Sequence, residues 1–229
     1  MTTVATPPTT ATAAAAGAEM ATIHSAFRRE LRLAPALVRS VDHGDRLRAG
    51  VVSAHLDLVD RFLHHHHTIE DSMVWPKLLD RVPAEIMPIV ELMETQHEIV
   101  ADVLKRTRAL RMEWRKDADS SRAAQLATLY AQLHDALVEH LDAEERHVMP
   151  LVEACMTQKE WATIGRAAQR GTAFRDGPRM LGMLAYDGNP DVIRHMLAAV
   201  PAPVRDTVIK IGQRAYAKHA TRVYGTPTP

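Results

Sequence analysis

Residues 63–76 read LHHHHTIEDSMVWP, and this stretch lies inside the chain with apolar residues at helical spacing on both sides. Its most informative feature is the four-residue step from His66 to Glu70. Residues four apart on a helix share one face, so an imidazole and a carboxylate at this spacing can reach the same metal ion. The same step returns at His140 and Glu144. In both places a second acid follows directly, and a proline lies six residues beyond the first acid.

Both steps lie in the apolar stripe of their predicted helix. The first stripe contains Leu56, Val59, Leu63, His66, Glu70 and Met73, and the second contains Leu126, Leu129, Leu133, Leu137, His140, Glu144 and Val148. Ionisable groups in a core stripe are costly unless they are paired or bind a metal. A buried His–Glu pair without metal explains one such step. Two steps, together with core-facing His24 and His97 on two further helices, favour a metal site.

The composition narrows the functional classes. The chain has 229 residues with a net charge of zero, and its basic residues are spread along it, which argues against nucleic-acid binding. Cys155 is the single cysteine, so no intramolecular disulfide and no thiolate metal cage can form. No stretch approaches about 18 consecutive apolar residues, and the N-terminus lacks a signal-peptide pattern. We therefore predict no membrane segment and a cytoplasmic location.

The periodicity predicts an all-α protein, an up-down-up-down four-helix bundle with a C-terminal helical extension. The expected helices run from about residue 20 to Pro35, which interrupts or ends the first, and over about 46–72, 83–115 and 121–147. The second is expected to end at Trp75 and Pro76. The expected domains are a disordered arm at 1–18, a metal-binding bundle at 19–152 and a helical extension at 153–229.

The inward-facing donors are four imidazoles and two carboxylates, without sulfur. Such mixed nitrogen and oxygen sets suit iron, manganese or zinc. Two carboxylates facing each other across a bundle can bridge two metal ions, and six side chains would not saturate two six-coordinate ions. A closed structural zinc site needs only four ligands, which would leave two of the six idle.

His24, residues 66–76, His97 and residues 140–150 together resemble the hemerythrin-like (HHE cation-binding) family, in particular its actinobacterial branch, over roughly residues 20–150. The resemblance implies a four-helix bundle that holds a non-haem centre of two iron ions, oxo- or hydroxo-bridged. By the same resemblance, the terminal ligands are His24, His66, His97 and His140, and the bridging ligands are Glu70 and Glu144.

The chain departs from the pattern of the oxygen-carrying members in two ways. They have a further histidine one turn after the third-helix ligand, where this chain has Ala101. Their last helix also spaces its histidine and acid five residues apart, and here the step is four. We therefore expect one iron to lack a histidine, which argues against reversible oxygen carriage. His147 lies seven residues after His140 on the same face, and it could be a substitute ligand or a hydrogen-bond partner of one.

Residues beside the predicted ligands have expected roles of their own. Asp71 and Glu145 follow the bridging acids directly and are expected to accept hydrogen bonds from ligand N–H groups or to be solvated. The remaining histidines of the run, His64, His65 and His67, point off the stripe and are expected to be exposed. An alternative register, with His67 and Asp71 facing inward, would place polar groups away from the stripe.

The favoured function is a di-iron protein that reacts with or senses hydrogen peroxide, dioxygen or nitric oxide, in a catalase-like or stress-protective role. One alternative is a reversible oxygen or iron carrier without turnover, and another is a structural module that holds zinc or no metal. The choice between enzyme and carrier stays open at this point. The expected partners are small-molecule ligands, with no nucleic acid and no membrane, and the chain is expected to be a monomer or a homodimer.

Overall fold

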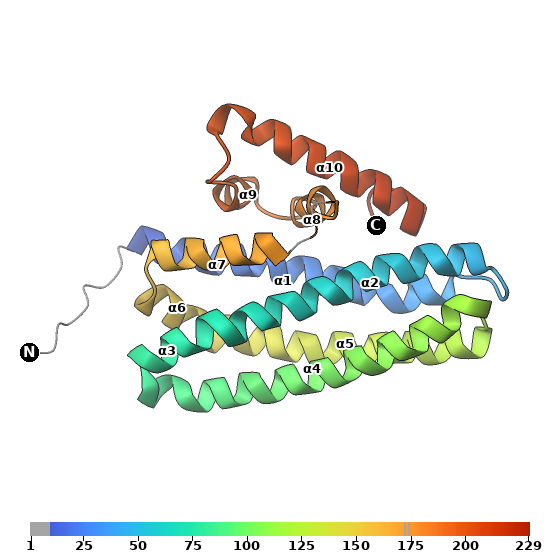
Figure 1. Ribbon diagram of the computed structural model, residues 1–229, viewed down its shortest axis with the longest axis horizontal. Helices are drawn as coiled ribbons and strands as arrows, with labels where there is room; N and C mark the ends of the chain where they lie inside the picture. The colour runs from blue at the N-terminus through green and yellow to red at the C-terminus, as the bar shows by residue number, and fades with distance from the viewer. Residues whose placement is uncertain (1–9, 172, 174) are drawn as a thin grey trace, which may run out of the picture.

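The computed structural model describes residues 10–171, 173 and 175–229, and within them every regular element is a helix. Four long helices lie side by side as a bundle (Figure 1). They are α1 (Thr10–Arg39), α2 (Arg46–Ile69), α4 (Pro83–Asp117) and α5 (Ser120–His147). Helix α5 packs against α1 and α4, and α2 contacts both of these as well, which closes the bundle. The predicted all-α four-helix bundle is confirmed.

The turns between the long helices follow from local capping chemistry. The side chain of Asp45 accepts a hydrogen bond of 2.9 Å from the N–H of Arg48 at the start of α2. Asp119 caps α5 in the same way through the N–H of Arg122. Aspartate is a favoured N-cap because it satisfies an N–H that has no partner within the helix. These caps start both helices close to the predicted positions.

The second helix does not end at Trp75 and Pro76 as predicted. It passes through a π-helical turn (η1, Glu70–Val74) into the short helix α3 (Trp75–Arg81). Pro76 falls at the start of α3, where a missing N–H is tolerated. The N–H of Trp75 bonds to the carbonyl of Glu70, five residues back. Such turns are rare and often lie at functional sites.

Helix α1 is longer than predicted at both ends. Residues 1–9 of the expected disordered arm lie outside the described residues, but residues 10–18 are helical. Alanine has the highest helix propensity, and Ala16 is buried in an apolar cluster at the far end of the bundle. Pro35 does not end the helix, which continues to Arg39. Ala34 and Val38 are fully buried, and this packing offsets the roughly 3 kcal/mol that a proline costs inside a helix.

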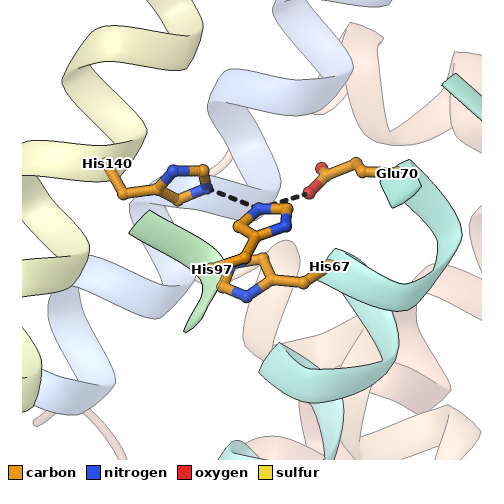
Figure 2. Close-up of side chains that lie close together, drawn as sticks. All are labelled: His67, Glu70, His97 and His140. Atoms are coloured by element: carbon orange, nitrogen blue, oxygen red, sulfur yellow. Dashed lines mark hydrogen bonds and ion pairs between the residues drawn. The ribbon is translucent and has the colours of Figure 1, made fainter. Parts of the chain in front are cut away.

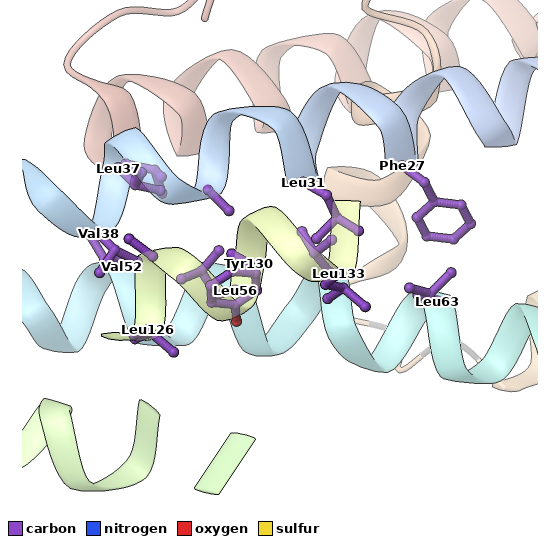
Figure 3. Packing of buried hydrophobic residues seen from close by; sticks show 14 of the residues in the cluster. Phe27, Leu31, Leu37, Val38, Val52, Leu56, Leu63, Leu126, Tyr130 and Leu133 are labelled. Carbon is purple, nitrogen blue, oxygen red and sulfur yellow. The ribbon is translucent and has the colours of Figure 1, made fainter. Parts of the chain in front are cut away.

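The core of the bundle consists of two apolar clusters with a polar layer between them. The flanking members, one from each cluster, are Met20 and Phe27 on α1, Leu63 and Val74 on α2 and its continuation, Met93 and Val100 on α4, and Leu137 on α5 with Val148 directly after it. Figure 3 shows the packing of the larger cluster. The histidines and glutamates of the predicted site all fall between the members of these pairs. They are therefore enclosed by apolar side chains at both ends.

Five further helices follow the bundle. They are α6 (Met149–Cys155), α7 (Gln158–Gly171), α8 (Gly177–Leu184), α9 (Pro190–Met196) and α10 (Ala202–Tyr224). Helices α8 and α10 approach closely, since a Cβ atom on Gly182 would lie 2.0 Å from the carbonyl oxygen of Gly212. In Figure 1, helices α8, α9 and α10 lie on the side of the bundle formed by α1 and α2. Whether 153–229 is a unit separate from the bundle stays a prediction.

A buried polar network joins α10 to the bundle. The carboxylate of Glu30 accepts hydrogen bonds of 2.7 Å from the hydroxyls of Tyr216 and Tyr224 and one of 2.9 Å from Arg29. The ring of His55 lies 3.3 Å from the same carboxylate and 2.8 Å from the Tyr224 hydroxyl. Burial alone would raise the pKa of Glu30, but His55, Arg29 and Tyr216 together lower it to about 2.

This network predicts a loss of stability in acid. Glu30 has a lower pKa in the folded chain than its ordinary value of 4.5, so its contribution is present above pH 4.5 and disappears as the pH falls toward 2. The shift corresponds to about 3 kcal/mol. Glu30→Gln should lower the free energy of unfolding at neutral pH, and the gap to the wild type should close in acid. Urea titrations of both proteins across this range measure the gap, and a gap that stays constant would contradict the prediction.

Candidate metal centre

Seven ionisable side chains from the four bundle helices and the turn after α2 meet in the polar layer. They are His24 on α1, His66 and His67 on α2, Glu70 on the π-helical turn, His97 on α4, and His140 and Glu144 on α5. Each of them is at most 9% exposed. The structure thus brings together all six predicted ligands and adds His67 to them.

The seven side chains divide into two groups that share one carboxylate. One group contains His67, Glu70, His97 and His140, and the other contains His24, His66, Glu70 and Glu144. Within each group, one nitrogen or oxygen atom from every residue lies within 4.8 Å of the others. Figure 2 shows the first group, with the rings of three histidines and the Glu70 carboxylate turned toward one another. A carboxylate shared by the two groups could bind a cation in each of them.

The fit of this cluster to metal ions rests on its unpaired polar atoms. Buried atoms without a hydrogen-bond partner are Nε2 of His24, His66 and His67 and both carboxylate oxygens of Glu70 and Glu144. Some lie close together, such as His66 Nε2 and Glu70 Oε1 at 2.9 Å, but they are not aligned for a hydrogen bond. Buried polar groups are rarely left unpaired. Seven such atoms in one place fit a site in which cations are the missing partners.

Three of the imidazoles are held from outside through their Nδ1 atoms. The pairs are His97 with Asp71 Oδ1 at 2.8 Å, His24 with Glu145 Oε1 at 2.7 Å, and His140 with Gln96 Oε1 at 3.3 Å. An oxygen acceptor at Nδ1 favours the tautomer with its proton there, which leaves the Nε2 lone pair facing the centre. The sequence predicted such contacts for Asp71 and Glu145. It gave no sign of Gln96, because a glutamine beside a histidine has no distinctive pattern.

Comparison with known families agrees with this geometry. Residues 16–152, more than half of the chain, match the family described as Hemerythrin HHE cation binding domain. The chain belongs to the hemerythrin family. Comparisons with curated proteins and with solved structures found no match. Among the described residues of this hemerythrin, no helix combines the length and the apolar character needed to cross a membrane.

The electrostatics of the hemerythrin cluster keep three imidazoles neutral. Burial lowers the pKa of His66 and of His140 to about 3. Burial, together with the neighbouring imidazoles, also lowers the pKa of His67 well below its ordinary value. A neutral imidazole has a lone pair for a metal ion. These three side chains therefore need no deprotonation to bind one at neutral pH.

The pKa values of the two glutamates and His24 depend on one another. Burial and the nearby Glu144 raise the pKa of Glu70 well above its ordinary value. Burial alone would lower the pKa of His24, but Glu144 and Glu145 raise it to about 9. His24 in turn lowers the pKa of Glu144 against the effect of burial. A cation in the cluster would take the place of these protons, so metal binding should release protons.

The structure corrects the prediction that His67 is exposed. Its ring is buried and stacks on His97, with centroids 4.1 Å apart and an interplanar angle of 14°. Helix α2 packs between α1 and α4, so two consecutive positions on it face two different neighbours. His66 lies against Phe27 of α1, whereas His67 faces α4. The alternative register is also only half right, because the Asp71 side chain is half exposed.

Two other expectations about this hemerythrin are wrong. His147 is exposed and does not enter either group, because α5 ends at that residue and turns the chain into α6. Ala101 is exposed as well, so a histidine at that position would not face the cluster. His67 supplies a third imidazole to the group that contains His97. The expected shortage of one histidine therefore does not exist.

Proposed function

We propose that the protein holds two iron ions in this cluster and that it reacts there with hydrogen peroxide, dioxygen or nitric oxide. The proposal rests on one observation, the two groups of four possible ligands that share Glu70. Seven buried atoms of these groups lack hydrogen-bond partners. Each group would supply enough ligands for one cation, and the shared Glu70 would hold two cations next to each other.

The donor chemistry supports iron. Imidazole and carboxylate without sulfur suit iron, manganese and zinc, and membership of a cation-binding family is consistent with all three. A structural zinc site is usually a closed set of four ligands around one ion, whereas these groups are joined through Glu70. Iron and manganese also undergo the one-electron changes that reaction with a small oxidant needs, whereas zinc does not.

The chain's own residues control access and protons. The apolar clusters at both ends of the polar layer exclude water from it. His24 contacts Glu145 through Nδ1, and Glu145 accepts a hydrogen bond of 2.7 Å from Arg28. Glu145 and Arg28 are partly exposed, with side chains at 34% and 26%. This chain of contacts connects the buried imidazole to solvent and offers a path for protons that leave or enter the cluster.

One observation removes an objection to a second function, reversible oxygen binding. The departure at Ala101 argued against it, because one iron appeared to lack a histidine. With His67 in the cluster, one group contains three imidazoles and the other contains two. The ligand count therefore no longer separates a carrier from a reactive centre, and solution chemistry has to do so.

The test begins with protein expressed in iron-supplemented medium. Elemental analysis should give two iron ions per chain, one for each group, with charge-transfer absorption in the near ultraviolet. The iron-loaded protein is then mixed with hydrogen peroxide, dioxygen or nitric oxide while the spectrum and peroxide consumption are followed. Metal-free and zinc-loaded protein are the controls, and neither should consume peroxide.

The outcomes separate the two functions. Peroxide consumption or an irreversible spectral change supports the reactive centre. A spectral change with dioxygen that reverses on removal of the gas, without peroxide turnover, supports the carrier. Protein that binds one zinc ion in preference to iron, or that binds no metal, would overturn both functions and favour a structural module.

A further inference from the structure

The indole of Trp75 is joined to the candidate metal centre through Asp71. Trp75 Nε1 donates a hydrogen bond of 3.0 Å to Asp71 Oδ1, and His97 Nδ1 lies 2.8 Å from the same oxygen. The rings of Trp75 and His97 are 6.2 Å apart between centroids. Trp75 is 1% exposed. A single carboxylate oxygen thus links a buried indole to an imidazole whose opposite nitrogen faces the cluster.

This arrangement lies at the π-helical turn. Asp71 lies within the turn and Trp75 directly follows it. The turn places the Asp71 carboxylate between the indole of its own segment and the His97 ring of α4.

Indole is one of the protein side chains that most readily gives up a single electron. The Asp71 carboxylate, at hydrogen-bond distance from the indole, stabilises the resulting cation by Coulomb attraction, although the Asp71 side chain is itself half exposed. Trp114 is a second fully buried indole, but its Nε1 has no hydrogen-bond partner, and two other buried aromatic groups also have different surroundings. The Tyr130 hydroxyl contacts Asp60 and Arg111. Phe27 stacks near His66, but its ring is much harder to oxidise.

We propose that Trp75 supplies one electron to the metal centre during its reaction with hydrogen peroxide. The proposal rests on the proposed function. Reduction of one hydrogen peroxide molecule to two water molecules consumes two electrons and two protons. One electron comes from the indole and the other from the bound metal, while the protons come from solvent. The indole keeps its Nε1 proton and becomes a radical cation beside the Asp71 carboxylate, and a phenol-class donor in solution restores each electron.

A purely structural role for Trp75 makes different predictions. In that case the indole only holds Asp71 in place for His97. Replacing Trp75 would then change the metal affinity, but the ring in the wild-type protein would not be oxidised. Electron donation predicts that the ring itself is oxidised when the donor in solution is left out. The oxidation state of Trp75 therefore distinguishes the two roles, and activity alone does not.

The experiment uses iron-loaded full-length protein mixed with hydrogen peroxide without a donor. Rapid freezing and electron paramagnetic resonance detect an organic radical, and peptide mass spectrometry locates oxygen added to indole rings. The matched control is Trp161, whose Nε1 donates a hydrogen bond of 2.8 Å to Glu19 but has no contact with the cluster. Trp161 is also more exposed than Trp75, so peroxide acting from solution would modify Trp161 first.

The expected result is oxidation at Trp75 several-fold above that at Trp161, which a phenol-class donor suppresses and metal-free protein does not show. Trp75→Phe should abolish the radical and Trp161→Phe should not. Hydroxylation of Phe27 to the same extent as Trp75 would indicate diffusing radicals and would overturn the proposal. If Trp75→Phe loses its iron, the variant cannot be compared with the wild type. The pattern of indole oxidation in the wild-type protein then tests the proposal by itself.

Failure of this proposal can be told apart from failure of the proposed function. Wild-type protein that binds iron and consumes peroxide without a radical or oxidation at Trp75 overturns electron donation and leaves the peroxide-reactive centre intact. Wild-type protein that binds no iron, or binds it without reacting with peroxide, overturns electron donation together with the peroxide reaction from which it follows.

Discussion

Glu70→Gln should remove both metal ions while leaving the metal-free chain at least as stable as the wild type. Glu70 belongs to both groups of the cluster, and it is 1% exposed. Without a cation its ionised form is unfavourable, since burial and the nearby Glu144 raise its pKa. Glutamine has nearly the same shape and no charge, so it relieves this cost. It cannot bridge two cations as a carboxylate does.

Two measurements test the expected loss of metal and the expected stability of the metal-free variant. Elemental analysis should fall from two metal ions per chain to nearly none, and thermal unfolding should show that added iron no longer stabilises the variant. Metal at about 1,000 times its dissociation constant would stabilise the wild type by about 4 kcal/mol. The control is Glu139→Gln, an exposed position on the same helix as Glu144, which should keep both metals. A Glu70 variant that still binds two ions would mean that the cluster is not bridged through this residue.

His67→Ala should leave one of the two metal positions much weaker than the other. His67 belongs to the group with His97 and His140 and not to the group with His24. Loss of an outer hydrogen-bond partner already costs about 10- to 100-fold in metal affinity, and loss of a direct ligand should cost more. The Nε2 atom of His67 has no hydrogen-bond partner, so the metal-free variant loses no hydrogen bond at that atom, and its stability falls only through the lost packing of the ring on His97.

The measurement is a metal titration followed by absorption and calorimetry. Wild type should bind two ions tightly, and His67→Ala should bind one tightly and one weakly. His64→Ala is the matched control, because it lies in the same run of histidines and is exposed. Equal metal binding by the two variants would mean that His67, although buried, is not a metal ligand.

Most of the cluster can be predicted from the sequence because its signals are local. A four-residue step puts His66 and Glu70 on one face of any α-helix, and the same holds for His140 and Glu144. The apolar stripe around each step shows that the face is buried. His24 and His97 are found in the same way, from their place in a stripe. None of these inferences depends on how the helices are arranged.

His67 and Gln96 could not be found by that reasoning. Periodicity assigns one stripe to each helix, but α2 contacts both α1 and α4 and so buries a wider arc than one stripe. His67 falls in the additional arc. Gln96 contacts His140 across the bundle, and a contact between helices leaves no mark in the spacing of either one.

The helices, their order and the donor types of the centre follow from the amino-acid sequence, because hydrogen bonding and hydrophobic periodicity act over a few residues. The packing of the helices settles which histidines share a carboxylate. It also settles the position of Asp71 between His97 and Trp75. These contacts depend on the rotation of α2 against its two neighbours and on the extra residue in its π-helical turn. Both are properties of the assembled core, in which side chains far apart in the chain must fill one space.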